Sequence, residues 1–267
     1  MKYTFGFIGT GNMGSAIAKA VAKCKSGKNI ALANRSTQKA QLLADEIGAV
    51  VLDNKTVAQQ CNYIFLGVKP QMMEQVLLEI KDILQSRKSE IVLISMAAGL
   101  TTDKICEMAG GTVAVVRIMP NTPVAIGKGV IVYCSNYLAK EKEAFVADAL
   151  SMGGLVDKID ENLIDIATVV MGCAPAFAAL FAENLAKGGE HNGLKKEKAI
   201  LYAAKMMEGT AALMLETGKP PEALRKEVCS PGGSTIKGVE LLMDNDFENI
   251  VKQAVNASYN RTKELGK

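Results

Sequence analysis

The stretch Thr4-Phe5-Gly6-Phe7-Ile8-Gly9-Thr10-Gly11-Asn12-Met13-Gly14 decides the fold of the first part of the chain. A β-branched and aromatic run leads into glycines spaced G-x-G-x-x-G, and a helical pattern follows from Ser15. In this strand–loop–helix context the first glycine permits a tight turn, the second lets backbone approach a pyrophosphate, and the third lets helix and strand pack closely. The alternative is a glycine-rich turn without a ligand. The residues predicted to form a dinucleotide site are Ile8, Gly9, Thr10, Gly11, Asn12, Met13 and Gly14.

Strands and helices alternate along the chain as far as about residue 160. Strands are predicted at 4–8, 29–33, 63–68, 91–95, 113–118, 129–134 and 155–157. Helices are predicted between them at 15–23, 38–46, 72–85, 102–108 and 140–150. This alternation predicts βαβ units and a parallel sheet that helices cover on both faces.

Beyond residue 160 only helical patterns follow, at 163–171, 176–191, 196–216, 222–227, 235–243 and 247–265. Several are apolar on most faces, as at 199–204 and 211–215, and such helices must be buried. A small domain cannot bury so many by itself, which predicts a homodimer with interlocking helical halves. The predicted fold is α/β, with a Rossmann-type dinucleotide-binding domain at residues 1–160 followed by an all-α dimerisation domain at residues 161–267.

Composition narrows the class of function. The net charge is only +3 and tryptophan is absent, which argues against a nucleic-acid partner. A single histidine, His191, and six cysteines without a C-x-x-C pair predict no metal site and reduced thiols. The uncharged stretch 166–182 contains Gly172 and Pro175 and is short for a membrane span, so no membrane association is expected. With no signal peptide at the start, we expect a cytoplasmic protein that acts on a small molecule.

The segment after the second strand indicates which dinucleotide is bound. NAD binding favours a carboxylate there, to accept a hydrogen bond from the ribose 2′-hydroxyl. This chain instead has Asn34, Arg35 and Ser36, which offer a planar cation and two polar side chains to a 2′-phosphate. We therefore predict NADPH as the cofactor, with NADH as a weaker alternative.

Further loops at strand ends are expected to meet the cofactor, because ligands of open α/β sheets lie outside the carboxyl ends of the strands. The cofactor-binding candidates in these loops are Val68, Lys69, Pro70, Ala97, Ala98 and Gly99. The segment Met119-Pro120-Asn121-Thr122-Pro123 ends a third strand, and its prolines hold a rigid polar loop over the nicotinamide, with Asn121 as a substrate-binding candidate. Each segment alone could be a plain turn, and their joint placement favours the functional interpretation.

The segment Val228-Cys229-Ser230-Pro231-Gly232-Gly233-Ser234-Thr235-Ile236 lies in the helical half. Ser-Pro-Gly-Gly followed by hydroxyl residues is expected to open a helix, whose first N–H groups lack partners within the helix. Such a turn can bind a carboxylate or a phosphate. The alternative is an ordinary helix cap with a glycine loop.

Taken together, the G-F-I-G-T-G-N-M-G, V-K-P, M-A-A-G, R-I-M-P-N-T-P and S-P-G-G-S-T segments resemble those of the pyrroline-5-carboxylate reductase family over essentially the whole chain. The resemblance implies hydride transfer from NAD(P)H to the C=N bond of 1-pyrroline-5-carboxylate, which yields L-proline. It also implies that Asn54 contacts the cofactor. The substrate-binding residues predicted in this way are Ser230, Gly232, Gly233, Ser234, Thr235 and Asn121.

In this family the Thr235 hydroxyl would hydrogen-bond the ring nitrogen, which makes Thr235 the predicted catalytic residue. The amides of Gly233, Ser234 and Thr235 would hold the substrate carboxylate. The resemblance further implies that the glycine turn belongs to the partner subunit of each site, and that assemblies larger than a dimer occur.

The chain departs from the family at Gly172-Cys173-Ala174-Pro175-Ala176-Phe177, where G-S-G-P-A-[YF] is usual. Cys173 and Ala174 therefore leave open a non-catalytic NADPH-binding paralogue. A β-hydroxyacid dehydrogenase is a second alternative, but the lysine expected at the start of its helical half is absent from 168–177.

Overall fold

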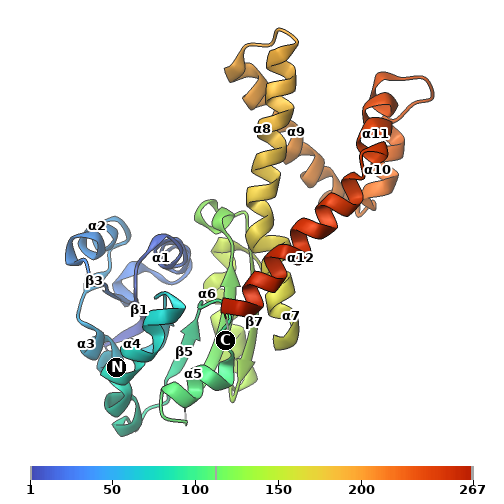
Figure 1. Cartoon of the computed structure of the whole chain (residues 1–267). Coiled ribbons are helices and arrows are strands. Elements are labelled where there is room, and N and C mark those ends of the chain that lie inside the picture. Colours follow the sequence, from blue (N-terminus) through green and yellow to red (C-terminus); the bar gives the residue numbers. More distant parts are fainter. Residues whose placement is uncertain (1, 112, 266–267) are drawn as a thin grey trace. The chain divides into compact units, whose positions relative to one another are not determined.

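A computed structural model describes residues 2–111 and 113–265 and divides the chain into two compact units. The first comprises Met1–Cys173 and Tyr259–Lys267, and the second Ala174–Ser258. Residues 1, 112, 266 and 267, which the predicted domains include, lie outside the described residues. The sheet belongs to the first unit and the second unit is helical (Figure 1), while the boundary at 160/161 stays a prediction.

The first unit contains an eight-stranded sheet in the order β3-β2-β1-β4-β5-β6-β7-β8. Neighbouring strands are parallel except for the antiparallel pair β6 and β7. The strands are β1 (Tyr3–Ile8), β2 (Ile30–Ala33), β3 (Val50–Val51), β4 (Cys61–Leu66), β5 (Val92–Ser95), β6 (Ala114–Pro120), β7 (Gly129–Asn136) and β8 (Gly154–Lys158). All predicted strands are present, and β3 was missed because two residues are too short for a periodic signal.

Helices cover both faces of this sheet, which confirms the predicted fold class (Figure 1). They are α1 (Asn12–Lys25), α2 (Thr37–Ile47), α3 (Asn54–Gln60), α4 (Pro70–Ser86), α5 (Thr102–Met108), α6 (Lys140–Leu150) and α7 (Glu161–Ala167). Phe5 and Phe7 of β1 pack into one core cluster with α1, whereas Ile8 belongs to the cluster on the opposite face with α4. Strands buried on both faces explain the nearly continuous apolar runs in the sequence.

The helical run that leaves the sheet is continuous from Glu161 to His191, although the sequence predicted two helices. A π-helical turn, η4 (Thr168–Cys173), joins α7 to α8 (Ala174–His191). By length and composition alone this run could cross a membrane, but a single such helix is weak evidence for a membrane span. Ile164 and Val169 are fully buried in the protein, and Asp165 pairs with Arg117 of β6.

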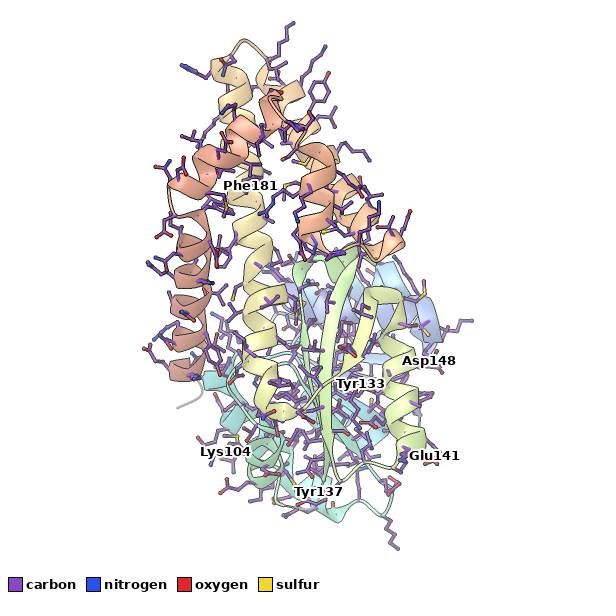
Figure 2. All side chains as sticks on the ribbon, turned by 90° about the vertical axis from the view of Figure 1, so that its right-hand side faces the viewer. Lys104, Tyr133, Tyr137, Glu141, Asp148 and Phe181 are labelled. Carbon is purple, nitrogen blue, oxygen red and sulfur yellow. The ribbon has the colours of Figure 1, made fainter. Side chains whose placement is uncertain are left out.

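The second unit consists of helices that bury few of their own apolar side chains. They are α8, α9 (Lys196–Thr217), α10 (Pro221–Val228), α11 (Ser234–Asp244) and α12 (Phe247–Leu265), the last of which ends in the first unit. Ala186, Ala199 and Ala203 form a small buried cluster between α8 and α9. Phe181 of α8, labelled in Figure 2, is 42% exposed although its ring contacts Phe247. Exposed apolar helices on this scale fit a surface that a second copy covers.

Candidate active site

The predicted glycine loop lies where the strand order of the sheet reverses. Strand β1 is parallel to both β2 and β4, so the carboxyl ends of all three strands lie at one edge. Backbone hydrogen bonds join these ends, since Gly9 N–H donates to the Ala33 oxygen and Gly67 N–H to the Ile8 oxygen, each over 2.8 Å. Parallel α/β sheets bind ligands in the crevice at this kind of reversal point.

Gly9, Gly14 and Gly67 allow a backbone approach that no side chain would permit. Gly9 has a φ of 95°, in the left-handed region that favours glycine. A Cβ atom on either Gly14 or Gly67 would lie 2.3 Å from the Gly9 carbonyl oxygen. The sequence motif identified Gly9 and Gly14, whereas the need for glycine at 67 follows from the pairing of β4 with β1.

Packing within the protein does not require glycine at position 11, because nothing described lies within 4 Å of a Cβ atom placed there. Asn12 and Met13 begin α1, and the first N–H groups of this helix have no partner inside it. The hydroxyl of Thr10 is buried and makes no hydrogen bond within the described residues. Open space beside unpaired donors fits a pyrophosphate, so the residues present fit a dinucleotide.

The two glycines are expected to respond differently to the same added methyl group. Gly14→Ala forces a Cβ against the Gly9 oxygen and lowers the melting temperature of the unliganded protein. Gly11→Ala leaves that temperature unchanged but weakens NADPH binding about tenfold or more, the equivalent of about 1.4 kcal/mol. Thermal unfolding and fluorescence titration measure the two effects. Unchanged NADPH affinity in Gly11→Ala would contradict the placement of the pyrophosphate.

Asn34 links the glycine loop to the segment after β2. Its Oδ1 accepts a hydrogen bond from Thr10 N–H at 3.3 Å, and its Nδ2 donates to the Ser36 carbonyl oxygen at 3.2 Å. The Asn34 side chain therefore fixes the backbone of the glycine loop and that of the segment after β2. Arg35 and Ser36 are exposed, and no hydrogen bond or ion pair of the Arg35 guanidinium is found within the described residues. This leaves the guanidinium available for a phosphate.

The loop after β4 and the start of α3 hold further predicted cofactor residues. Val68 is half-buried, Lys69 is the exposed cap of α4, and Pro70 is the first residue of that helix. Asn54 begins α3, and its Nδ2 donates to Glu79 Oε2 of α4 at 2.8 Å. The role of Asn54 as a cofactor contact stays a prediction.

Ala97, Ala98 and Gly99 follow β5 at the same edge of the sheet. Ala97 is buried and its N–H donates to the Ser95 hydroxyl at 3.3 Å. Ala98 packs against the apolar cluster that contains Ile164 of α7. Gly99 has a φ of 77°, so glycine is favoured there for conformational reasons.

Asn121, a predicted substrate residue, is buried and holds the π-helical turn. Its Nδ2 donates to the Met171 carbonyl oxygen and its Oδ1 accepts from Val130 N–H, both at 2.9 Å. In an α-helix the Met171 oxygen would accept from residue 175, but Pro175 has no N–H. Asn121 supplies the missing donor, which gives this side chain a structural task that the sequence did not show.

The 230–235 turn opens α11 as the sequence predicted. Gly232 has a φ of 74°, and Gly233 N–H donates to the Ser230 oxygen at 3.0 Å. The Gly233 amide is thus used by the turn itself. Ser234 and Thr235 are exposed, and their N–H groups belong to the first turn of α11, where no carbonyl of the helix can accept them.

The six cysteines are free thiols, and three of them, Cys61, Cys106 and Cys134, are buried. Burial raises the pKa of Cys61 and of Cys134 to about 12. These two thiols therefore stay protonated at neutral pH and offer no thiolate as a nucleophile.

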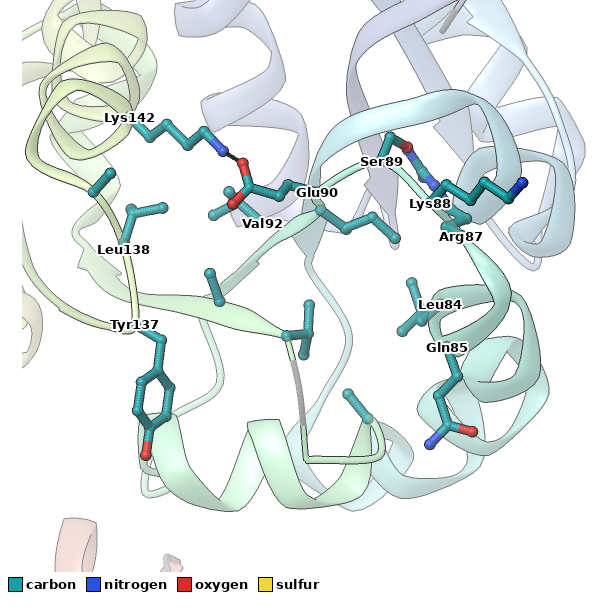
Figure 3. Close-up of a pocket in the computed structure, with 15 residues that line it drawn as sticks. Leu84, Gln85, Arg87, Lys88, Ser89, Glu90, Val92, Tyr137, Leu138 and Lys142 are labelled. Carbon is teal, nitrogen blue, oxygen red and sulfur yellow. Dashed lines mark hydrogen bonds and ion pairs between the residues drawn. The ribbon is translucent and has the colours of Figure 1, made fainter.

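A cavity of about 290 Å³ lies at the opposite edge of the sheet, near the start of β5 and the end of β7. Its lining includes Lys88, Tyr137 and the ion pair between Glu90 and Lys142 (Figure 3). The length of the strands separates this cavity from the glycine loop. It therefore contributes nothing to the cofactor site.

Comparisons with known proteins identify the class and then the family. Residues 4–99 match a family described as NADP oxidoreductase, coenzyme F420-dependent, and residues 161–265 match pyrroline-5-carboxylate reductase dimerisation. The fold and the glycine loop thus define an NADP-type oxidoreductase. Pyrroline-5-carboxylate reductases of Corynebacterium melassecola and Aquifex aeolicus are 36% and 33% identical to the chain, over 99% and 97% of its length and 99% and 96% of theirs. The chain belongs to the pyrroline-5-carboxylate reductase family.

Solved structures agree with this assignment over the full length of the chain. A pyrroline-5-carboxylate reductase of Coxiella burnetii has a TM-score of 0.91 at 32% identity, with 100% of both chains covered. The Plasmodium falciparum pyrroline carboxylate reductase with NADP bound has a TM-score of 0.89 at 32% identity, again with 100% of both chains covered.

Proposed function

We propose that this chain performs the reaction of its family, the NADPH-dependent reduction of 1-pyrroline-5-carboxylate to L-proline, the last step of proline biosynthesis. The observation that carries this proposal is the open space at Gly11, beside unpaired helix N–H groups, in a chain that also retains the 230–235 turn. Full-length similarity to named reductases, one of which was solved with NADP bound, supports both the reaction and the cofactor.

The strand order gives the cofactor a direction across the sheet. Gly11 would hold the pyrophosphate, and Arg35 and Ser36, which follow β2, would bind the 2′-phosphate. Val68–Pro70 after β4 and Ala97–Gly99 after β5 would contact the nicotinamide half. NADPH supplies the hydride when it is bound. NADH lacks the phosphate that Arg35 binds and is the weaker donor.

The substrate is held by the turn that opens α11. N–H groups of Ser234 and Thr235 donate to its carboxylate, while Ser230, Gly232 and Gly233 set the shape of the turn. The Thr235 hydroxyl accepts a hydrogen bond from the protonated imine nitrogen. As hydride adds to the ring carbon, the π electrons pass to this nitrogen, which keeps its proton and takes a second from water. Thr235 thus orients the ring and needs no ionised base beside it.

A homodimer is the smallest assembly in this proposal. The dimerisation match at 161–265 and the exposed apolar side chains of α8 and α9 support it. Each site would combine the glycine loop of one subunit with the 230–235 turn of the other, and larger assemblies of dimers are compatible with this. We place the enzyme in the cytoplasm as a soluble protein, with no membrane or nucleic-acid partner. Asn121 braces the π-helical turn through its hydrogen bond to the Met171 carbonyl oxygen, and its contact with the substrate remains part of this proposal.

Absorbance at 340 nm tests the reaction when the purified chain is mixed with 1-pyrroline-5-carboxylate and either reduced cofactor. We expect oxidation of NADPH, slower oxidation of NADH, and L-proline in an amount equal to the NADPH consumed. A chain that binds NADPH but oxidises neither cofactor would be a non-catalytic paralogue, the alternative that Cys173 and Ala174 motivate.

A further inference from the structure

The loop that follows β5 is held at its far end by a carboxylate from α7. Glu161 Oε1 accepts a hydrogen bond from Thr102 N–H at 2.7 Å, and Glu161 Oε2 accepts one from the Thr102 hydroxyl at 2.8 Å. Thr102 is buried and is the first residue of α5. It follows Gly99 by three positions, so little slack remains between this anchor and the loop.

Glu161 is itself fixed by the buried Arg117 of β6. The Arg117 side chain is 3% exposed, with Nη2 2.6 Å from Asp165 Oδ1 and Nη1 3.6 Å from Glu161 Oε1. Removing either carboxylate would leave part of a buried cation without its counterion, which is costly. The network therefore ties the start of α7 to β6 and to α5 at once.

The middle of the same loop also contacts the elements that this network joins. Ala98 packs against the apolar cluster of Met119 from β6 and Ile164 from α7. At the near end, the Ser95 hydroxyl accepts from Ala97 N–H. The loop is thus held at three points, and Glu161 provides the polar one at the far end.

We propose that Glu161 is a positioning residue for the cofactor: through Thr102 it sets the loop Ala97–Gly99 and thereby the binding of the nicotinamide half of NADPH. This inference rests on the proposed function, in which that loop contacts the cofactor. Nothing in the spacing of the sequence reveals this role, because Glu161 and Thr102 are 59 positions apart.

Two ligands separate this role from a general structural one. NADPH contains the nicotinamide, whereas 2′-phospho-ADP-ribose lacks that ring and keeps the adenosine, the pyrophosphate and the terminal ribose. Glu161→Ala should weaken NADPH binding about tenfold, the loss of roughly one hydrogen bond to a charged group. Binding of 2′-phospho-ADP-ribose should not change.

Four further variants sharpen the comparison. Glu161→Gln keeps an acceptor for Thr102 N–H and a donor for the Thr102 hydroxyl oxygen, so it should retain most of the NADPH affinity. Glu107→Ala serves as the matched control and should change neither affinity, because Glu107 lies on α5 with Thr102 but forms only an exposed ion pair with Lys104. If Glu161→Ala does not fold, Thr102→Val replaces it, since the valine removes one of the two hydrogen bonds and Thr102→Ser restores it.

The outcomes distinguish this inference from the proposed function. If the unsubstituted protein binds the two ligands equally, the loop Ala97–Gly99 does not contribute to binding the nicotinamide. That result would overturn both the proposed loop contact and the inference. A second result is that the unsubstituted protein binds NADPH more tightly than 2′-phospho-ADP-ribose, and that Glu161→Ala and Thr102→Val both keep this difference. This result would overturn the inference and leave the proposed function intact. Equal weakening of both ligands would also overturn it, because it would indicate a general loss of structure.

Discussion

Replacing Thr235 with alanine should lower kcat for 1-pyrroline-5-carboxylate reduction about 100-fold and leave the Kd of NADPH unchanged. The hydroxyl hydrogen-bonds the charged imine nitrogen in the proposed complex, and a hydrogen bond to a charged group contributes about 1.5–3 kcal/mol. The cofactor-binding residues proposed here belong to the first unit, whereas Thr235 lies in α11 of the second. The substitution therefore removes none of the proposed contacts to NADPH. Steady-state kinetics and a fluorescence titration give the two quantities.

Thr235→Ser is the matched variant for this prediction. Serine keeps the hydroxyl at the same position of α11, so most of the turnover should return. Full activity in Thr235→Ala would remove the hydroxyl from the reaction. A parallel loss in both variants would point to packing of the threonine methyl group instead.

We expect that replacing Arg35 with glutamate raises the Kd of NADPH about 100-fold, because the charge-assisted hydrogen bonds to the 2′-phosphate would be lost and a like charge would take their place. The Kd of NADH changes far less, since that cofactor has no phosphate at this position. Isothermal titration with both cofactors measures the ratio of the two affinities.

Lys28→Glu makes the same change of charge at the opposite end of β2, in an exposed turn before the strand, and should leave both affinities unaltered. An equal loss of NADPH and NADH affinity in Arg35→Glu would show that Arg35 supports the loop rather than the phosphate. A loss in Lys28→Glu of the same size would assign the effect to net charge.

The glycine loop and the order of the N-terminal elements could be predicted from the sequence because their causes are local. Gly9 and Gly11 lie between β1 and α1, and Gly14 lies in the first turn of α1, so the spacing of the three glycines alone reports the constraint. The turn before α11 was predictable for the same reason, since Gly232 and Gly233 directly precede the helix that they open.

Other features depend on contacts between distant segments and left no periodic signal. Gly67 is needed because β4 lies beside β1, which no local pattern shows. The π-helical turn requires both Pro175, which removes a donor, and Asn121, which replaces it from another element. The use of the Gly233 amide inside its own turn was also missed, because the sequence does not show which carbonyl it meets.

A crystal structure of the assembled protein with NADP⁺ and L-proline tests the central claim most directly. The account predicts the proline carboxylate within hydrogen-bonding distance of the N–H groups of Ser234 and Thr235. It also predicts the ring nitrogen beside the Thr235 hydroxyl, with the nicotinamide of the other subunit facing the ring. Proline bound away from this turn, or a nicotinamide that does not face it, would contradict the account.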